Sequence, residues 1–381
     1  MKRGFEDAEF QARTKRAQDM MSARGIEALL LTRETEIRYF TGYLTRFWES
    51  PSRPWFLVVP VNGDPVAVIP SIGAELMGRS WISDIRTWSS PDLIDDGVSL
   101  LSETLNELTA NDAKIATPSG HETWLRMPLA DFERLKTSIG TRQIVGDDAM
   151  IATLRGIKSD AEIEKIEAAC VIAGRAFDRV PEIASEGVAV DQVFRDFQRL
   201  CLEEGADWVP YLSGAAETDG YGDVISLAKE ALLQARDVLM LDTGLILDGY
   251  FCDYDRNFSV GVPSDAVASG HARLIEATDA GFEAAKPGAK ASDIFYAMNE
   301  ICSQSGGTDA GRLGHGLGMS LTEWPSLIAT DHTEIKTGMV LTLEPGLAVG
   351  DKIMVHEENI VITESGARYL SPKANAEILR I

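Results

Sequence analysis

The chain has 381 residues, of which 45% are hydrophobic and 7% aromatic, and its formal net charge at pH 7 is -23. A chain of this length exceeds a typical single core, so we expect two domains. The excess of acidic residues, 59 against 36 basic ones, argues against a nucleic-acid partner, which would need a basic footprint. No apolar run approaches the roughly 18 residues of a membrane span, so we expect no membrane partner.

Four cysteines, at positions 170, 201, 252 and 302, are widely spaced and form no CxxC pair. This spacing favours reduced thiols over a disulfide framework. The first residues are charged and follow a helical pattern, without the apolar segment of a signal peptide. We therefore expect a cytoplasmic protein.

The first part of the chain alternates between helix-like and strand-like segments. Residues 6–24 have the apolar spacing of an amphipathic helix, and the short apolar strand "GIEALLLT" follows. The segment "RPWFLVVPVNGDPVAVIP" predicts a hairpin that turns at residues 62–64, Asn-Gly-Asp. The alternation continues to about residue 150, which predicts an α/β domain over residues 1–150.

The second part of the chain begins with helices and ends with strands. Ser159 and Glu162 have the spacing of a capping box at the start of a helix. A second helix, the β-rich stretch 239–258 and two more helices follow, and strand-like runs dominate the tail. This order predicts an α+β domain over residues 151–381.

The stretch 239–258, "LMLDTGLILDGYFCDYDRNF", carries four aspartates where strands disfavour them. Asp248 and Gly249 suit a turn between two strands, and such a turn can bring Asp242 and Asp253 together on one face. Like charges that lie so close are costly unless a cation or a shared proton neutralises them. The alternative is a turn capped by one aspartate, with the other in solvent.

Two glutamates and one histidine occupy comparable positions nearer the end of the chain. Glu344 and Glu357 each end or interrupt an apolar strand, and His315 lies between glycines that allow close backbone approach. Singly, each residue has an ordinary structural explanation. With Asp242 and Asp253, however, they form a set of hard oxygen donors and one imidazole. Such a set suits Mn, Fe, Co or Zn and can hold two ions bridged by carboxylates.

Four short motifs follow one another along the chain: "DTGLILDGYFCDYDR", "GHGLG", "LEPG" and "EENIVIT". With them the chain resembles the creatinase/aminopeptidase P/prolidase superfamily, the pita-bread metallopeptidases of family M24, over almost its full length. The resemblance implies a creatinase-type N-terminal domain over residues 1–150 and a pita-bread catalytic domain over residues 151–381. It also implies five metal ligands, which are Asp242, Asp253, His315, Glu344 and Glu357.

The resemblance further implies a dinuclear metal-dependent hydrolase of the Xaa-Pro dipeptidase or aminopeptidase type. In that chemistry, a hydroxide that bridges two divalent ions, with Mn favoured here, attacks an amide carbonyl. Glu344 would be the catalytic residue that moves a proton to the leaving nitrogen. The expected partners are a dipeptide or another small molecule and a second copy of the chain in a homodimer.

The chain departs from the family pattern around the expected substrate. Thr322 stands where the peptidases carry a histidine, and Thr remains neutral near pH 7. A second family histidine is missing from "YLSGAAETDGYGDVISL". Val355 replaces a common Arg, and Asp255 replaces a usual Thr or Ser. His356 and Arg256 lie close enough in sequence to substitute.

Asp255 could share the strand face of Asp253 and bind a cationic group, or it could pair with Arg256 or another Arg. Aromatic side chains can bind a quaternary ammonium or sulfonium by cation–π attraction, although more often they form pocket walls. The candidate substrate contacts are Thr322, Asp255, Tyr221, Trp324 and His356.

Three functions fit these departures to different degrees. The first is the Xaa-Pro peptidase. The second is a non-peptidase that acts on a small zwitterionic compound, as relatives do that hydrolyse ectoine or cleave dimethylsulfoniopropionate. The third, a binding module without activity, is disfavoured by the five retained ligands.

Overall fold

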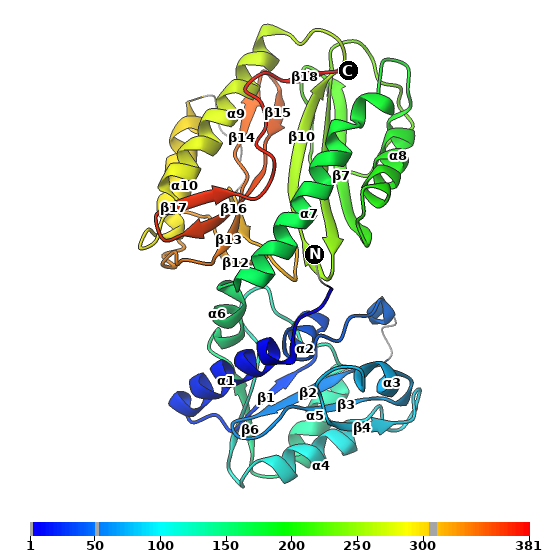
Figure 1. Ribbon diagram of the computed structural model, residues 1–381, viewed down its shortest axis with the longest axis vertical. Coiled ribbons are helices and arrows are strands. Elements are labelled where there is room, and N and C mark those ends of the chain that lie inside the picture. Colours follow the sequence, from blue (N-terminus) through cyan, green and yellow to red (C-terminus); the bar gives the residue numbers. More distant parts are fainter. Residues whose placement is uncertain (1–2, 50–52, 305–310) are drawn as a thin grey trace. The chain divides into compact units, whose positions relative to one another are not determined.

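The computed structural model describes residues 3–49, 53–304 and 311–381, and they form two compact units. One unit extends to Arg155 and the other runs from Gly156 to Ile381 (Figure 1). The division falls near the end of helix α6 (Met150–Gly156), a few residues beyond the boundary expected from the sequence. Among the helices described, none is both long and apolar enough to cross a bilayer.

The N-terminal unit is built on a six-stranded sheet with the order β4-β3-β2-β1-β5-β6. Neighbouring strands are antiparallel in the β1–β2 and β2–β3 pairs and parallel in the other three. The β2–β3 pair confirms the predicted hairpin. The strands are β1 (Ala28–Leu31), β2 (Phe56–Pro60), β3 (Val66–Pro70), β4 (Asp84–Trp88), β5 (Lys114–Thr117) and β6 (Gln143–Gly146).

Helices pack on this sheet and bury its central strands. β1, β2 and β3 are buried at every position, as expected for strands covered on both faces. The apolar side of α4 joins the core through Leu101 and Leu105. The helices are α1 (Asp7–Arg24), α2 (Glu34–Thr41), α3 (Ala74–Met77), α4 (Val98–Leu108) and α5 (Leu129–Ser138), with short 3-10 turns at Phe47–Glu49 and Ser71–Gly73.

The C-terminal unit begins with the helix that the capping box predicts. The Ser159 side chain accepts a hydrogen bond from the Glu162 backbone, and the Glu162 carboxylate accepts one from the Ser159 backbone. The helices of this unit are α7 (Asp160–Asp178), α8 (Val190–Glu203), α9 (Asp265–Ala284) and α10 (Ala291–Ser303), with a 3-10 turn at Val180–Glu182.

Two five-stranded sheets and a hairpin complete this unit, which confirms the α+β prediction. The first sheet has the order β18-β10-β8-β7, with β9 paired to β8, and the second has the order β12-β11-β13-β16-β17. Helices α7 and α8 contact the first sheet, and α9 and α10 lie beside the second (Figure 1).

The strand bounds place four candidate ligands at or beside strand ends and Asp242 within a strand. The first sheet contains β7 (Trp208–Thr218), β8 (Asp237–Leu247), β9 (Tyr250–Phe251), β10 (Tyr254–Ser259) and β18 (Leu379–Arg380). The second contains β11 (His315–Gly316), β12 (Glu323–Ser326), β13 (Val340–Leu343), β16 (Glu358–Thr363) and β17 (Gly366–Tyr369), and the hairpin contains β14 (Gly346–Val349) and β15 (Lys352–Val355).

Candidate metal centre

The first two candidate ligands come from the long hairpin of the first sheet. Asp242 lies in the middle of β8, and Asp253 comes directly before β10. Both are buried. Asp248 and Gly249 turn the chain between them with positive φ angles of 49° and 82°. Asp248 also pairs with Lys165 of α7 at 2.5 Å, so the predicted turn is fixed to a helix.

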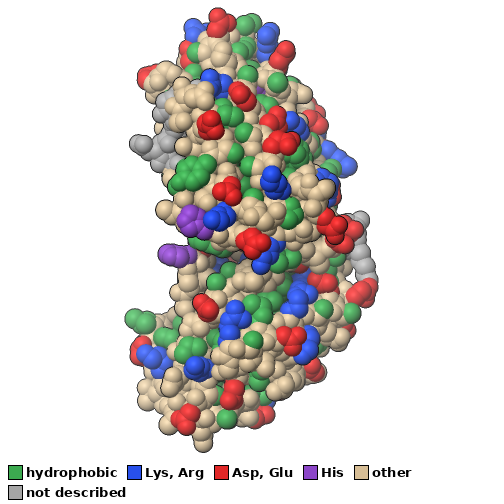
Figure 2. Space-filling view, turned by 90° about the vertical axis from the view of Figure 1, so that its left-hand side faces the viewer, with side chains coloured by type: hydrophobic (Ala, Val, Ile, Leu, Met, Phe, Trp, Pro, Cys, Tyr) green, Lys and Arg blue, Asp and Glu red, His purple; other side chains and the backbone are tan. Residues whose placement is uncertain are grey.

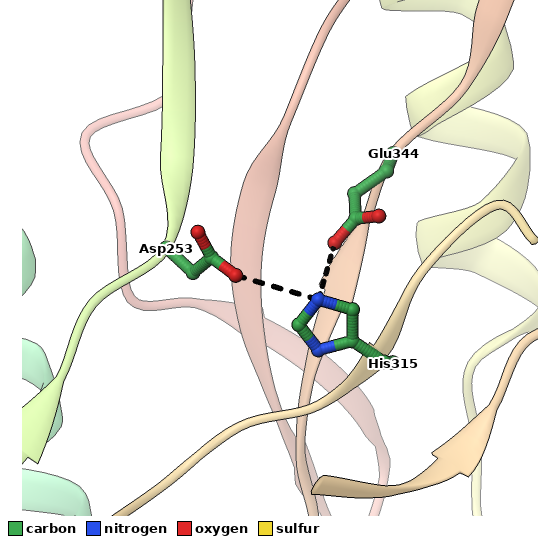
Figure 3. A group of neighbouring side chains, drawn as sticks. All are labelled: Asp253, His315 and Glu344. Carbon is green, nitrogen blue, oxygen red and sulfur yellow. Dashed lines mark ion pairs between the residues drawn. The ribbon is translucent and has the colours of Figure 1, made fainter. Parts of the chain in front are cut away.

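The histidine and the next glutamate belong to the second sheet. His315 Nε2 lies 2.9 Å from Glu344 Oε1 and 3.4 Å from Asp253 Oδ2 (Figure 3). Other backbone segments pack closely against the glycines on either side of His315, as the sequence predicted. A Cβ on Gly314 would lie 2.3 Å from the Thr342 carbonyl oxygen, and one on Gly316 would lie 2.5 Å from that of Trp324.

Glu357 completes the candidate set from the link between β15 and β16. The five side chains form two groups that share Asp253. One group is Asp253, His315 and Glu344, and the other is Asp242, Asp253 and Glu357; within each group the donor atoms lie within 4.8 Å of one another. Residues far apart in the sequence therefore converge on two adjacent positions.

Burial, together with the neighbouring charges, shifts the pKa of every member. Burial raises the pKa of Asp253 to about 6. The pKa of Asp242 and that of Glu357 are also raised, first by burial and then by the neighbouring carboxylates. Burial alone would lower the pKa of His315, but Glu344 and Asp253 raise it to about 10. Burial opposes ionisation of Glu344 as well, and yet His315 holds its pKa at about 2.

The residues fit a metal ion by two criteria. Asp242 Oδ1 is buried and has no hydrogen-bond partner in the described part of the chain. Such an orphaned oxygen is costly unless a cation approaches it. The donor set, four carboxylates and one imidazole, suits divalent Mn, Fe, Co or Zn.

Hydrogen bonds orient the candidate ligands, and sequence reasoning missed the residues that make them. Thr342 Oγ1 donates to Glu344 Oε1 at 2.5 Å and accepts from the His315 backbone N–H at 2.9 Å. The Asn359 side chain bonds to the backbone of Asp253. The only sequence signal is the i, i+2 alternation that puts Thr342 beside Glu344.

Two further hydroxyls, from Ser213 and Tyr211 of β7, lie near Asp242. Ser213 stands directly across from Asp242 in the β7–β8 register, and its Oγ lies 3.3 Å from Asp242 Oδ2. The half-buried Tyr211 hydroxyl lies 2.8 Å from Ser213 Oγ. The Ser213 hydroxyl therefore contacts Asp242 Oδ2, and Asp242 Oδ1 is left for a cation.

The candidate substrate contacts occupy different environments. Asp255, Tyr221 and His356 are all buried, whereas Thr322 and Trp324 are half-buried. Trp324 Nε1 donates to Thr333 Oγ1 at 3.0 Å. Contact of these five residues with substrate stays a prediction.

Arg256, one alternative partner for Asp255, forms an ion pair with Glu358 at 3.0 Å. The Asp255 carboxylate instead lies beside His356, with Oδ1 3.3 Å from the ring Nδ1. Asp255 and His356 therefore belong to a buried polar cluster, together with Arg256 and Glu358.

Comparison with known proteins assigns the family. Residues 164–364 match the model of metallopeptidase family M24, and residues 13–157 match the creatinase/prolidase N-terminal domain. The chain belongs to family M24. This M24 chain is accordingly a metal-dependent hydrolase, and the resemblance drawn from its motifs is confirmed.

Relatives and a solved structure agree with this assignment. The chain is 31% identical to the Xaa-Pro dipeptidase of Pyrococcus furiosus over 253 residues, which are 65% of this chain and 72% of the relative. It is 27% identical to the probable dipeptidase PepE of Mycobacterium tuberculosis over 380 residues, 96% and 95% of the two chains. The crystal structure of dipeptidase PepE from Mycobacterium ulcerans superposes with a TM-score of 0.85 at 25% identity, covering 99% of each chain.

Proposed function

We propose that this M24 chain is a dinuclear metallohydrolase that cleaves Xaa-Pro dipeptides or removes the residue before a proline at the start of a peptide. The observation that carries the proposal is the pair of donor groups that share Asp253. The names of the relatives, Xaa-Pro dipeptidase and dipeptidase PepE, support the substrate class. The proposal includes the preference for Mn and the homodimer that the resemblance implies.

In this proposal the five candidate ligands hold two divalent ions between the sheets. When bound, the ions supply Lewis acidity and lower the pKa of a water molecule toward neutrality. Asp253 takes part in both positions, since it belongs to both donor groups.

Glu344 is the residue that transfers a proton to the leaving nitrogen in this proposal. Its Oε1 is occupied by the Thr342 hydroxyl and by His315, and both of these contacts fix the carboxylate in one orientation. Its side chain retains 15% exposure, against 4% for His315 and 6% for Asp253, and Oε2 points away from His315 in Figure 3. A proton accepted at Oε2 can pass to the leaving nitrogen of the substrate.

The alternative, a non-peptidase acting on a small zwitterionic compound, keeps one observation in its favour. Thr322 occupies the place of a family histidine, and the segment around Ser213 contains no histidine to replace the other. The charge argument for a cationic substrate is weaker, however, because Asp255 is buried beside His356. We therefore keep the peptidase as the first candidate.

One assay separates these candidates. Metal-free protein is loaded with Mn, Fe, Co or Zn and incubated with Ala-Pro, Gly-Pro, Ala-Ala and a panel of zwitterionic osmolytes, and the release of proline is measured. The proposal predicts proline release from the Xaa-Pro dipeptides in at least one metal form. No proline release in any metal form would contradict the peptidase, and turnover of an osmolyte would favour the alternative.

A further inference from the structure

The segment that carries Glu357 is attached to the first sheet by side chains. β10 and β16 belong to different sheets. In the space between them, the Glu357 N–H donates to Asp255 Oδ1 at 2.8 Å, and the Glu357 carbonyl oxygen accepts from Arg256 Nη1 at 3.1 Å. Asn257 Nδ2 donates to the Val355 carbonyl oxygen at 2.7 Å. The side chains of three consecutive residues of β10 thus bond to the backbone at residues 355–357, in place of a ladder of backbone–backbone hydrogen bonds.

Tyr221 completes this attachment from the other side. Its buried hydroxyl accepts from the Val355 N–H at 2.7 Å and donates to Asn257 Oδ1 at 3.1 Å. The Tyr221 backbone also forms a bridge to Ile353. The backbone that leads into Glu357 is therefore held by contacts within the protein.

Asp255 is enclosed so that its carboxylate has little freedom. It is completely buried, and its Oδ1 lies 3.3 Å from His356 Nδ1. His356 Nε2 lies 3.3 Å from Glu358 Oε1, which in turn pairs with Arg256. Among the residues that the structure describes, neither His356 ring nitrogen has an aligned hydrogen-bond partner. The aligned bond that these residues give Asp255 Oδ1 is the one from the Glu357 N–H.

We propose that Asp255 is a positioning residue of the metal centre, which holds the Glu357 backbone so that the Glu357 carboxylate meets Asp242 and Asp253. This inference rests on the proposed metal site. It gives Asp255 a role that does not require contact with substrate. A Thr or Ser hydroxyl at this position would be shorter and would lack the second oxygen that faces Asn257 Nδ2 at 3.4 Å.

The inference predicts a defect in one half of the centre. His315 and Glu344 are oriented by Thr342, which has no bond to Asp255 among the described contacts. Loss of Asp255 should therefore weaken the position formed by Asp242, Asp253 and Glu357 and spare the position with His315. Removal of such a supporting partner typically lowers metal affinity about 10- to 100-fold.

The test uses the full chain, stripped of metal and titrated with Co²⁺, with calorimetry for affinity and visible absorption for the ligand field. Asp255→Ala removes the acceptor, whereas Asp255→Asn retains an amide oxygen for the Glu357 N–H. Asp237→Asn is the matched control, because Asp237 is also a buried aspartate of this sheet that accepts a backbone bond, from Gln234.

Wild-type protein should bind two Co²⁺ ions. Asp237→Asn should bind them with the same affinities as the wild type. Asp255→Ala should bind one ion normally and the other about 10- to 100-fold more weakly, with a changed absorption spectrum, and Asp255→Asn should restore most of that affinity. If Asp255→Ala does not fold, as judged by circular dichroism, Asp255→Leu, which is similar in size to Asp and has no acceptor, takes its place with the same expectation.

Three results would overturn the inference. Two normal sites in Asp255→Ala would mean that Asp255 does not position Glu357, while the proposed dinuclear function would stand. Equal defects in Asp255→Asn and Asp255→Ala would assign the effect to the charge of Asp255 or to direct ligation. Absence of Co²⁺ binding in the wild type would remove the proposed function and this inference together.

Discussion

Asp253 and Asn359 are 106 residues apart, and the Asn359 side chain holds both peptide groups of Asp253. Its Oδ1 accepts from the Asp253 N–H at 3.0 Å, and its Nδ2 donates to the Asp253 carbonyl oxygen. Asp255 of β10 holds Glu357 in return. The two sheets thus exchange side-chain bonds at the backbones of two candidate ligands, which fixes Asp253 and Glu357 relative to each other.

Asn359→Ala should weaken both metal positions, because both use Asp253. It leaves two buried backbone groups without partners, which should lower the free energy of unfolding by about 2–4 kcal/mol. Urea unfolding of the metal-free protein and calorimetric titration with Mn²⁺ measure the two effects. The exposed Asn375→Ala is the control. Equal affinities for Mn²⁺ in Asn359→Ala and the wild type would show that Asn359 does not orient Asp253.

Gly314→Ala should disturb His315. The added Cβ would lie 2.3 Å from the Thr342 carbonyl oxygen, and the φ angle of +140° is unfavourable for alanine. We expect a loss of about 2 kcal/mol or more in unfolding free energy together with weaker metal binding. Gly156→Ala, where nothing lies within 4 Å of the new Cβ, should change neither quantity appreciably. A Gly314→Ala protein with wild-type stability would contradict this packing argument.

His271 should make the stability of the chain depend on pH. It is buried, its Nε2 lies 3.0 Å from the Asn375 carbonyl oxygen, and burial lowers its pKa from 6.5 to about 4, with His356 and Arg256 acting in the same direction. Between these values the unfolded chain binds the extra proton. The stabilisation is therefore complete above pH 6.5 and is lost as the pH falls toward 4, by about 3 kcal/mol over the window.

The measurement is urea unfolding of the metal-free protein at several pH values between 4 and 7. His271→Gln should flatten the slope of unfolding free energy against pH, whereas exposed His332→Gln should leave it unchanged. An identical slope in His271→Gln and the wild type would show that His271 does not carry the dependence.

The sequence predicted this centre unevenly. The five candidate ligands could be named because each lies in a short motif of the family, and the β2–β3 hairpin and the capping box of α7 have local signals. Asn359 and Ser213 could not be found, since their partners lie on distant strands and no local pattern relates them. For Asp255, the i+2 argument was too weak to decide, because Asp253 precedes β10 and the geometry depends on how Glu357 meets that strand.

The most direct test of the account is the metal content of the purified chain after saturation and removal of free ions, by mass spectrometry, for the wild type and Asp253→Ala. We predict two ions per wild-type chain. Because Asp253 belongs to both donor groups, Asp253→Ala should lose both ions and all metal-dependent hydrolysis. A wild-type chain that binds no ions, or an Asp253→Ala variant that retains two ions and full activity, would contradict the central claim.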